Sequence, residues 1–158
     1  MNIVRIRTAE FGDIPSVVSL WRGMLDFHYL RDGRFELAED ADALFASHLE
    51  QALLRNDHRV AVALREAQVV GYVHAAFLEN LEMFRIRRYG LLSDLAVAPE
   101  MRRQGIGMAL WHAAQQWFSE QGISSVQLNV SEANPEAQEF WRACGFREFL
   151  KVLWCDLA

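Results

Sequence analysis

The chain has 158 residues, of which 52% are hydrophobic and 23% charged, a composition typical of one globular domain and not of a disordered or membrane-spanning chain. Acidic residues outnumber basic ones by 21 to 16, for a formal net charge of -5, which argues against nucleic acid as a partner because phosphate backbones are bound mainly through Lys and Arg. We therefore expect residues 1–158 to form a single cytoplasmic domain that does not bind membranes.

The first half of the chain predicts a strand, two helices and a hairpin. Residues 1–7 alternate between apolar and polar side chains and predict a short first strand. Apolar residues at helical spacing after Pro15 then predict a helix over about 13–29. A charged loop over 29–36, which could contact substrate, leads to a second helix that ends near Leu53. Two β-type runs, 59–64 and 69–77, are separated by four residues and predict an antiparallel hairpin.

The second half predicts alternating strands and helices. A strand over 91–97 stops before Pro99, which cannot continue a hydrogen-bonded ladder. Helical spacing then runs from Gly105 to about Gln121. The remaining expected elements are a strand over 126–130, a short helix over 135–143 and final β segments over 146–157. The order predicts an α/β protein with a mixed sheet and helices on both faces.

A glycine-bearing loop joins the strand over 91–97 to the helix that follows it. Gly105 and Gly107 lie where that helix begins, and the free N–H groups and dipole of a helix N-terminus favour an anion. A nucleotide-binding P-loop needs Lys and Ser or Thr after its last glycine, but here Met108 follows. The dinucleotide fingerprint needs a third glycine or alanine, and Leu110 occupies that position. The loop therefore does not predict a site for ATP or GTP, nor one for a nicotinamide or flavin dinucleotide.

Two motifs together resemble the GNAT superfamily of N-acetyltransferases. The first is the strand from Ser93 to Val97 followed by Arg102-Arg103-Gln104-Gly105-Ile106-Gly107. The second, residues 134–146, looks like the family's N-x-x-A-x-x-F-Y-x-x-x-G-F pattern. The order of the elements agrees over nearly the whole chain, so the resemblance implies a mostly antiparallel GNAT-like sheet flanked by helices.

The resemblance implies acetyl-CoA as the cofactor. Its pyrophosphate would bind the N–H groups at the helix start, and its pantetheine arm would pair like a strand with the preceding strand. The candidate cofactor-binding residues are Leu95, Ala96, Val97, Arg102, Arg103, Gln104, Gly105, Ile106, Gly107, Met108, Asn134 and Trp141. The two cysteines, Cys144 and Cys155, lack the spacing of a zinc site or a disulfide framework, so no metal is expected.

Acyl transfer to an amine needs a group that takes the amine's proton. Asp94, on the strand that should hold the pantetheine, and His74, on the neighbouring strand, are the candidate bases, although Asp94 could equally cap a turn or bind a cationic substrate. The family often has a tyrosine as the acid that protonates the leaving thiolate, but Trp141 stands there and an indole is not acidic. The unranked substitutes are Tyr72, Tyr89 and Ser131.

The leading interpretation is an N-acetyltransferase for a primary amine of a small molecule or a protein. The missing tyrosine motivates an alternative, a catalytically silent module that binds acyl-CoA. The loops 29–36 and 80–89 should line the acceptor site, and their mixed charges leave a cationic or an anionic acceptor open. A homodimer is also possible, because the apolar C-terminal residues around Phe149 and Trp154 could meet a second subunit.

Overall fold

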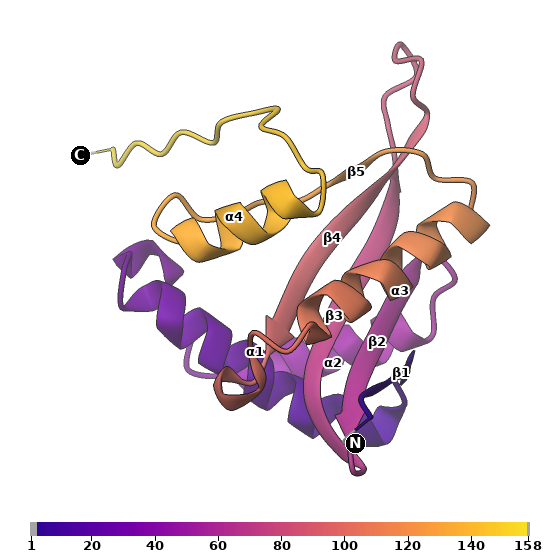
Figure 1. Cartoon of the computed structure of the whole chain (residues 1–158). Coiled ribbons are helices and arrows are strands. Elements are labelled where there is room, and N and C mark those ends of the chain that lie inside the picture. Colours follow the sequence, from indigo (N-terminus) through magenta and orange to yellow (C-terminus); the bar gives the residue numbers. More distant parts are fainter. Residues whose placement is uncertain (1–2, 158) are drawn as a thin grey trace.

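A five-stranded sheet forms the centre of the protein in the computed structural model, which describes residues 3–157 (Figure 1). The strands are β1 (Arg5–Thr8), β2 (His58–Arg65), β3 (Gln68–Glu79), β4 (Arg88–Val97) and β5 (Val126–Gln127). They lie in the sheet in chain order, and every neighbouring pair is antiparallel except β4 and β5, which are parallel. The predicted mixed, mostly antiparallel sheet is confirmed.

Helices cover both faces of this sheet, as the element order predicted. The helices are α1 (Ile14–Tyr29), α2 (Ala41–Leu53), α3 (Ile106–Glu120) and α4 (Pro135–Ala143). Helices α1 and α2 pack on one face, whereas α3 packs on the other, with α4 beside β5 (Figure 1). Among the described residues, no helix combines the length and the hydropathy that a membrane span requires.

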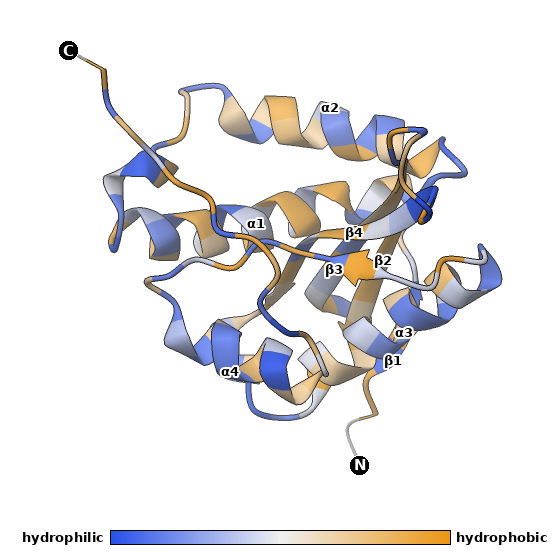
Figure 2. Cartoon of the chain, turned by 90° about the horizontal axis from the view of Figure 1, so that it is seen from above, coloured by the Kyte–Doolittle hydropathy of each residue, from blue (hydrophilic) through white to orange (hydrophobic). Residues whose placement is uncertain are grey.

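Each face of the sheet has its own apolar core because strand side chains alternate between the two faces. Val62 and Tyr72 point toward α1 and α2, where they meet Val17. Their neighbour Val73 points to the opposite face and joins the cluster around Leu110 of α3. Figure 2 shows the corresponding division of the helices into apolar and polar sides. The alternation of β3 and β4 therefore decides which functional side chains lie on which side.

Most predicted elements lie where the sequence placed them. The helix predicted over 135–143 has those bounds, because Asn134 caps it and Pro135 suits its first position. The hairpin of β2 and β3 is present, with Glu66 and Ala67 at its turn in left-handed conformations. The strand predicted over 91–97 begins earlier, at Arg88, because β3 also extends to Glu79 and pairs with it.

The C-terminal strands are the part of the prediction that is wrong for this chain. Residues 146–157 contain no strand, and of the strand predicted over 126–130 only Val126 and Gln127 are paired. Both segments have the composition of strands, but a strand also needs a hydrogen-bonding neighbour. Within one copy of the chain, β5 pairs with β4 alone and residues 146–157 pair with nothing described.

Candidate active site

The sheet opens between β4 and β5. These two strands pair only where Gly90 faces Val126 and Leu91 faces Gln127. Farther along, from Ser93 to Val97, no described strand lies beside this edge of β4. Unpaired backbone groups of a strand can hydrogen-bond an extended ligand that carries amides. The open edge of β4 is therefore a place for such a ligand.

A β-bulge lies where the opening begins. His74 of β3 faces Asp94, whereas the next residue, Ala75, faces Leu92, so Ser93 is an extra residue of β4. A bulge of this kind changes the direction of a strand and re-aims its side chains. It leaves Asp94 on the same face as Ala96, which packs with Tyr72 in the core under α1 and α2.

We call the loop over 98–105, just before α3, the anion loop, because it has the backbone conformation of an anion site. Arg103 and Gly105 have positive φ angles of 61° and 80°, and α3 starts at Ile106. Alternating left-handed residues turn successive N–H groups toward one point, and the first turn of a helix has N–H groups without internal partners. The first helical hydrogen bond here is from Ala109 to the Gly105 carbonyl, at 3.0 Å. The loop and the start of α3 thus present free donors to an anion.

Side chains around this loop hold its position. The Nε of Arg102 donates a hydrogen bond to the Val97 carbonyl at 3.1 Å, and the Nε2 of Gln104 donates to the Glu100 carbonyl at 3.4 Å. Arg103 lies 3.7 Å from Glu136 of α4, with both side chains largely exposed. Arg102 therefore ties the loop to the end of β4, while Arg103 forms an exposed ion pair with Glu136 of α4.

Phe140 is a residue of the site that the sequence reasoning did not single out, although it belongs to the second motif. A Cβ atom at Gly107 would lie 3.4 Å from the Phe140 ring and 3.7 Å from Leu95 Cδ2. Phe140 of α4 thus packs over the point where α3 begins beside β4. The lack of a side chain at Gly107 keeps the backbone there close to both neighbours.

Asp94 carries a half-buried carboxyl group. Burial raises the pKa of Asp94 from 3.8 to about 6. Burial, followed by the charge of Asp94, also raises the pKa of Tyr72, whose hydroxyl has no hydrogen-bond partner among the described residues. No described side chain forms an ion pair with Asp94 within 4 Å. A carboxylate with a pKa near 6 is ionised at neutral pH and can accept a proton.

His74 is buried and joined to other histidines. Its Nε2 lies 3.0 Å from the Nδ1 of His58, and the ring of the exposed His48 lies nearby, tilted by 58° with ring centroids 5.4 Å apart. Burial, followed by the charges of His58 and His48, lowers the pKa of His74 to about 3. Its neutral ring is therefore a much weaker proton acceptor at neutral pH than the Asp94 carboxylate. In the described part of the chain, no group of three His, Cys, Asp or Glu side chains is placed to hold a metal ion.

The structure separates the other predicted site residues. Trp141 is buried in the core, edge-on to Trp111 and Phe146. The Oδ1 of Asn134 accepts the N–H of Ala137 at 3.1 Å, so Asn134 caps α4. Both residues have structural contacts, and their predicted contacts with the cofactor stay a prediction.

Of the three substitutes for the missing tyrosine, only Tyr72 lies beside a candidate base. Tyr72 is fully buried on the face of Asp94. Tyr89 pairs with Leu78 near the distant end of β4, and the Oγ of Ser131 accepts the N–H of Ala133 at 3.2 Å.

A hollow of about 250 Å³ lies at the end of α1, on the side of the sheet that Asp94 faces. It is lined by Arg22, Asp26, Tyr29, Phe35, Glu36 and Leu37. Arg22 is paired with Asp42 of α2 at 2.8 Å, so the carboxylates of Asp26 and Glu36 dominate the charge of this hollow. Tyr29, Phe35 and Glu36 of the loop 29–36 thus contribute to it, and the predicted role of this loop at the acceptor site stays a prediction.

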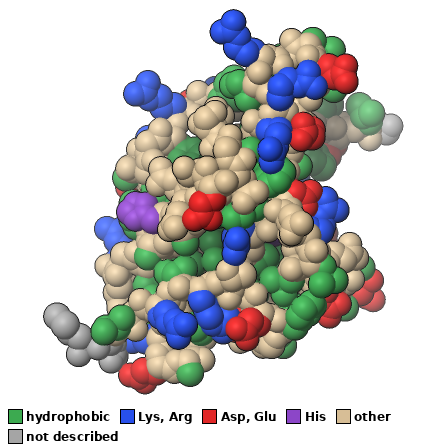
Figure 3. Space-filling view, turned by 90° about the vertical axis from the view of Figure 1, so that its right-hand side faces the viewer, with side chains coloured by type: hydrophobic (Ala, Val, Ile, Leu, Met, Phe, Trp, Pro, Cys, Tyr) green, Lys and Arg blue, Asp and Glu red, His purple; other side chains and the backbone are tan. Residues whose placement is uncertain are grey.

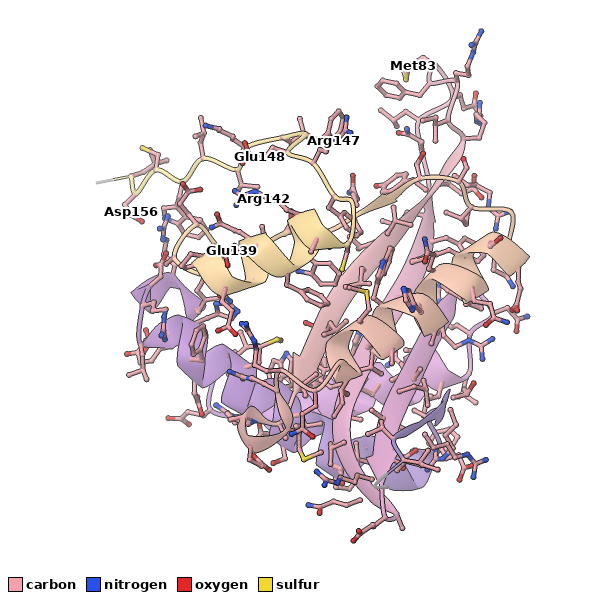
Figure 4. All side chains as sticks on the ribbon, viewed as in Figure 1. Met83, Glu139, Arg142, Arg147, Glu148 and Asp156 are labelled. Carbon is pink, nitrogen blue, oxygen red and sulfur yellow. The ribbon has the colours of Figure 1, made fainter. Side chains whose placement is uncertain are left out.

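The loop 80–89, which was also predicted to line the acceptor site, does not contribute to the hollow at the end of α1. Residues 80–87 form a narrow projection at the end of β3 and β4, with Met83 near its tip (Figure 4). Its charges are also partly satisfied, since Arg87 donates to the Glu82 carbonyl at 2.8 Å and Arg88 lies 3.6 Å from Glu79. The face in Figure 3 carries acidic and basic side chains interspersed, without a broad basic area.

Comparison with known proteins identifies the fold and the family. An uncharacterised N-acetyltransferase from Archaeoglobus fulgidus is 26% identical over 148 residues, covering 91% of this chain and 93% of the relative. A mutant of the BH1408 protein from Bacillus halodurans superposes with a TM-score of 0.88 at 22% identity, covering 98% and 99% of the two chains. An aminoglycoside N-acetyltransferase solved with CoA superposes with a TM-score of 0.75 at 18% identity, covering 98% and 95%.

Residues 21–146, most of the chain, match the model of the Acetyltransferase (GNAT) family. The match includes α3, α4 and the whole open edge of β4. The chain therefore belongs to the GNAT family of acetyltransferases and is an acyltransferase enzyme.

Proposed function

We propose that this enzyme transfers the acetyl group of acetyl-CoA to a primary amine that carries further positive charge. The single observation that carries the proposal is the placement of Asp94 beside the open edge of β4. That edge runs toward the anion loop at one end, and the acidic hollow of α1 lies on the face of the sheet to which Asp94 points. One strand would thus bring cofactor, base and acceptor together.

The residues around β4 fit CoA. The N–H groups of residues 103–108 would bind the diphosphate, which suits the left-handed residues and helix start found there. The amides of the pantetheine would pair with Leu95, Ala96 and Val97, whose outer edge is open. The relative solved with CoA has the same fold, which supports this placement.

Acetyl-CoA would supply the activated thioester, and the residues of this chain would manage charge and protons around it. The amine nitrogen attacks the thioester carbon directly, forming the C–N bond as the C–S bond breaks. Asp94 takes the proton that the amine loses, since its pKa near 6 leaves it ionised at neutral pH. A backbone N–H of Leu95 or Val97 would stabilise the negative charge on the carbonyl oxygen. The departing sulfur takes its proton from solvent, because a thiol of pKa ~8.5 is a fairly good leaving group.

The acceptor is proposed to be cationic because of the α1 hollow. Asp26 and Glu36 line it, and its one arginine, Arg22, is paired with Asp42. Carboxylates in such a hollow attract amines that carry several positive charges. Aminoglycosides, the substrates named for the relative solved with CoA, have this chemistry.

An acyl-transfer assay that detects free CoA thiol tests the proposal. The panel compares aminoglycosides and polyamines with neutral monoamines and with amino acids at equal concentration. Release of thiol with the polycationic amines supports the proposal, and Glu36→Gln should then raise the acceptor KM without changing the affinity for CoA. Glu39→Gln, outside the hollow, is the matched control.

The same panel tests the silent-module alternative. Tight CoA binding by calorimetry, together with no turnover on any amine, would favour a module that only binds acyl-CoA. A missing tyrosine acid does not require that alternative, because Trp141 lies in the core and the leaving thiolate can be protonated by water.

A further inference from the structure

Tyr72 of β3 is a fully buried tyrosine whose hydroxyl group has no partner. The residue is 0% exposed in the core under α1 and α2, and no described residue forms a hydrogen bond with its hydroxyl. A buried hydroxyl without a partner destabilises the folded state, so native proteins nearly always pair such a group. Packing alone does not explain the hydroxyl, because a phenylalanine ring would fill nearly the same space. Tyr72 therefore carries a donor that the fold itself does not use.

Asp94 lies beside Tyr72 and lacks a donor. Tyr72 faces Ala96 across β3 and β4, and Asp94 is the next residue of β4 on the same face. The two polar groups are close, since the charge of Asp94 acts on the Tyr72 hydroxyl. Burial alone changes the pKa of Asp94, without the lowering that a hydrogen-bond donor would cause. One face of the sheet thus holds an unused donor next to an acceptor that has none.

Substrates would make the lack of a donor at Asp94 more serious. In the free chain Asp94 is half-buried, so solvent reaches part of the residue. A cofactor along the open edge of β4, together with an amine, would exclude that solvent. A carboxylate that loses water without gaining a donor binds a proton and can no longer act as a base. The site therefore needs a donor from inside the protein, on the face to which Asp94 points.

The other titratable groups on this face do not supply that donor. His74 faces Asp94 across β3 and β4, but its Nε2 already lies 3.0 Å from the Nδ1 of His58. When that Nε2 donates its hydrogen to His58, the Nδ1 of the neutral His74 ring is an acceptor. None of the remaining titratable side chains of α1 and α2 changes the pKa of Asp94: Arg22, Asp26, His28 and Tyr29 of α1, and Asp42, His48 and Glu50 of α2.

We propose that Tyr72 is a positioning residue for Asp94, whose ionised carboxylate accepts a hydrogen bond from the Tyr72 hydroxyl, directly or through one bound water. This inference rests on the proposed role of Asp94 as the base. The hydrogen bond stabilises the charged carboxylate and holds it in one orientation, so Asp94 can still take the amine's proton once solvent is excluded. Tyr72 itself transfers no proton, because burial and the charge of Asp94 raise the pKa of its hydroxyl.

The pKa of Asp94 in Tyr72→Phe tests this hydrogen bond without reference to activity. Carbon-13 NMR of the Asp94 carboxyl group measures it from pH 4 to pH 9, with and without CoA, and Asp94→Asn identifies the signal. Hydrogen bonds to charged groups are strong, so the pKa of Asp94 should rise by about 1 when the hydroxyl is removed. An unchanged pKa overturns the proposal. Tyr89→Phe, the matched control near the other end of β4, should leave the pKa unchanged, and an equal rise there would also overturn the proposal.

Kinetics then connect the hydrogen bond to the base. In Tyr72→Phe the acid limb of kcat/KM should move to higher pH by the same amount as the NMR titration, whereas a merely structural role would lower the Tm and leave both curves in place. In an Asp94→Asn background, Tyr72→Phe should change kcat by no more than about twofold, because Tyr72 acts through Asp94. A larger additional loss overturns the proposal. If the NMR titration moves but the acid limb does not, the hydrogen bond stands and the proposed role of Asp94 as the base fails.

A crystal structure of the unmodified chain with CoA provides a measurement that does not depend on how a variant folds. At pH 8, where Asp94 is ionised, the Tyr72 hydroxyl oxygen should lie within hydrogen-bond distance of the Asp94 carboxylate or of a water that both groups contact. A Tyr72 hydroxyl that contacts neither the carboxylate nor such a water overturns the proposal.

Discussion

Replacing Asp94 by Asn should make the protein more stable at neutral pH and much less active. The pKa of Asp94 is raised by burial from 3.8 to about 6, so the folded state prefers the protonated carboxyl more than the unfolded state does. The stabilisation from this preference is complete below about pH 4 and is lost as the pH rises through 6. At pH 7.5 the folded protein carries an unfavourably buried carboxylate that the amide would remove.

The size of the effect follows from the shift. About two pKa units, at about 1.4 kcal/mol each, correspond to about 3 kcal/mol of stability at pH 7.5 and to nearly none at pH 4. For a domain of this size, 3 kcal/mol is roughly 6–12 °C in Tm. The amide keeps the shape of the carboxyl group, so packing changes little.

Thermal unfolding of both proteins from pH 4 to pH 8.5 measures this difference. The Tm of Asp94→Asn minus that of the wild type should be near zero at pH 4 and rise to its full value by pH 7. A difference that does not vary with pH would refute the reasoning, since it would mean that the Asp94 carboxyl is not desolvated in the folded protein.

Kinetics on the same variant separate a base from a substrate anchor. As a base, Asp94 should contribute ~10²-fold or more to kcat, with unchanged affinity for acetyl-CoA. The defect should shrink at high pH, where more of the amine is already neutral. A rise in acceptor KM at constant kcat would instead assign Asp94 to binding, and a kcat loss below about tenfold would assign the proton transfer to water or His74.

Three further predictions concern the anion loop, the histidines and the sheet. In calorimetry, Gly107→Asp should raise the Kd for CoA at least tenfold, whereas Gly107→Ala, whose Cβ lies at an ordinary 3.4 Å from Phe140, should not. Equal affinities of the two variants for CoA would mean that the phosphates bind at another place. Because the pKa of His74 is lowered, its contribution to the free energy of unfolding is full above pH 6.5 and falls by roughly 2 kcal/mol on acidification to pH 5. In denaturant titrations, His74→Gln should therefore reduce the loss of stability between pH 6.5 and pH 5. Gly90→Ala should lower the free energy of unfolding by roughly 1–3 kcal/mol, because its Cβ would lie 2.6 Å from the fully buried Phe118 ring; a wild-type Tm would show that the ring can move aside.

Local chemistry made much of this protein predictable. The bounds of α4 follow from the Asn134 cap and Pro135, and the start of α3 follows from Gly105, whose φ of 80° suits glycine. The two glycine-bearing motifs placed the chain in its family before any geometry was known. These signals are short in sequence, so no distant contact is needed to interpret them.

Contacts between distant residues were not predictable in this way. Spacing alone did not show that Phe140 lies over Gly107, that His58 bonds His74, or that Ser93 forms a bulge that sets the direction of Asp94. Each depends on which elements become neighbours and in which register they pair. A shift by one residue in β4 would send Asp94 to the opposite face of the sheet.

By itself, the sequence determined the type of nearly every element, the anion loop and the family, because capping, periodicity and glycine conformation act within a few residues. The tertiary structure alone decided that Asp94 is half-buried with a pKa near 6 while Trp141 lies in the core. It also decided that the strand-like residues 146–157 form no strand, because a β-strand exists only where another strand satisfies its backbone hydrogen bonds, and one copy of this chain provides none for them.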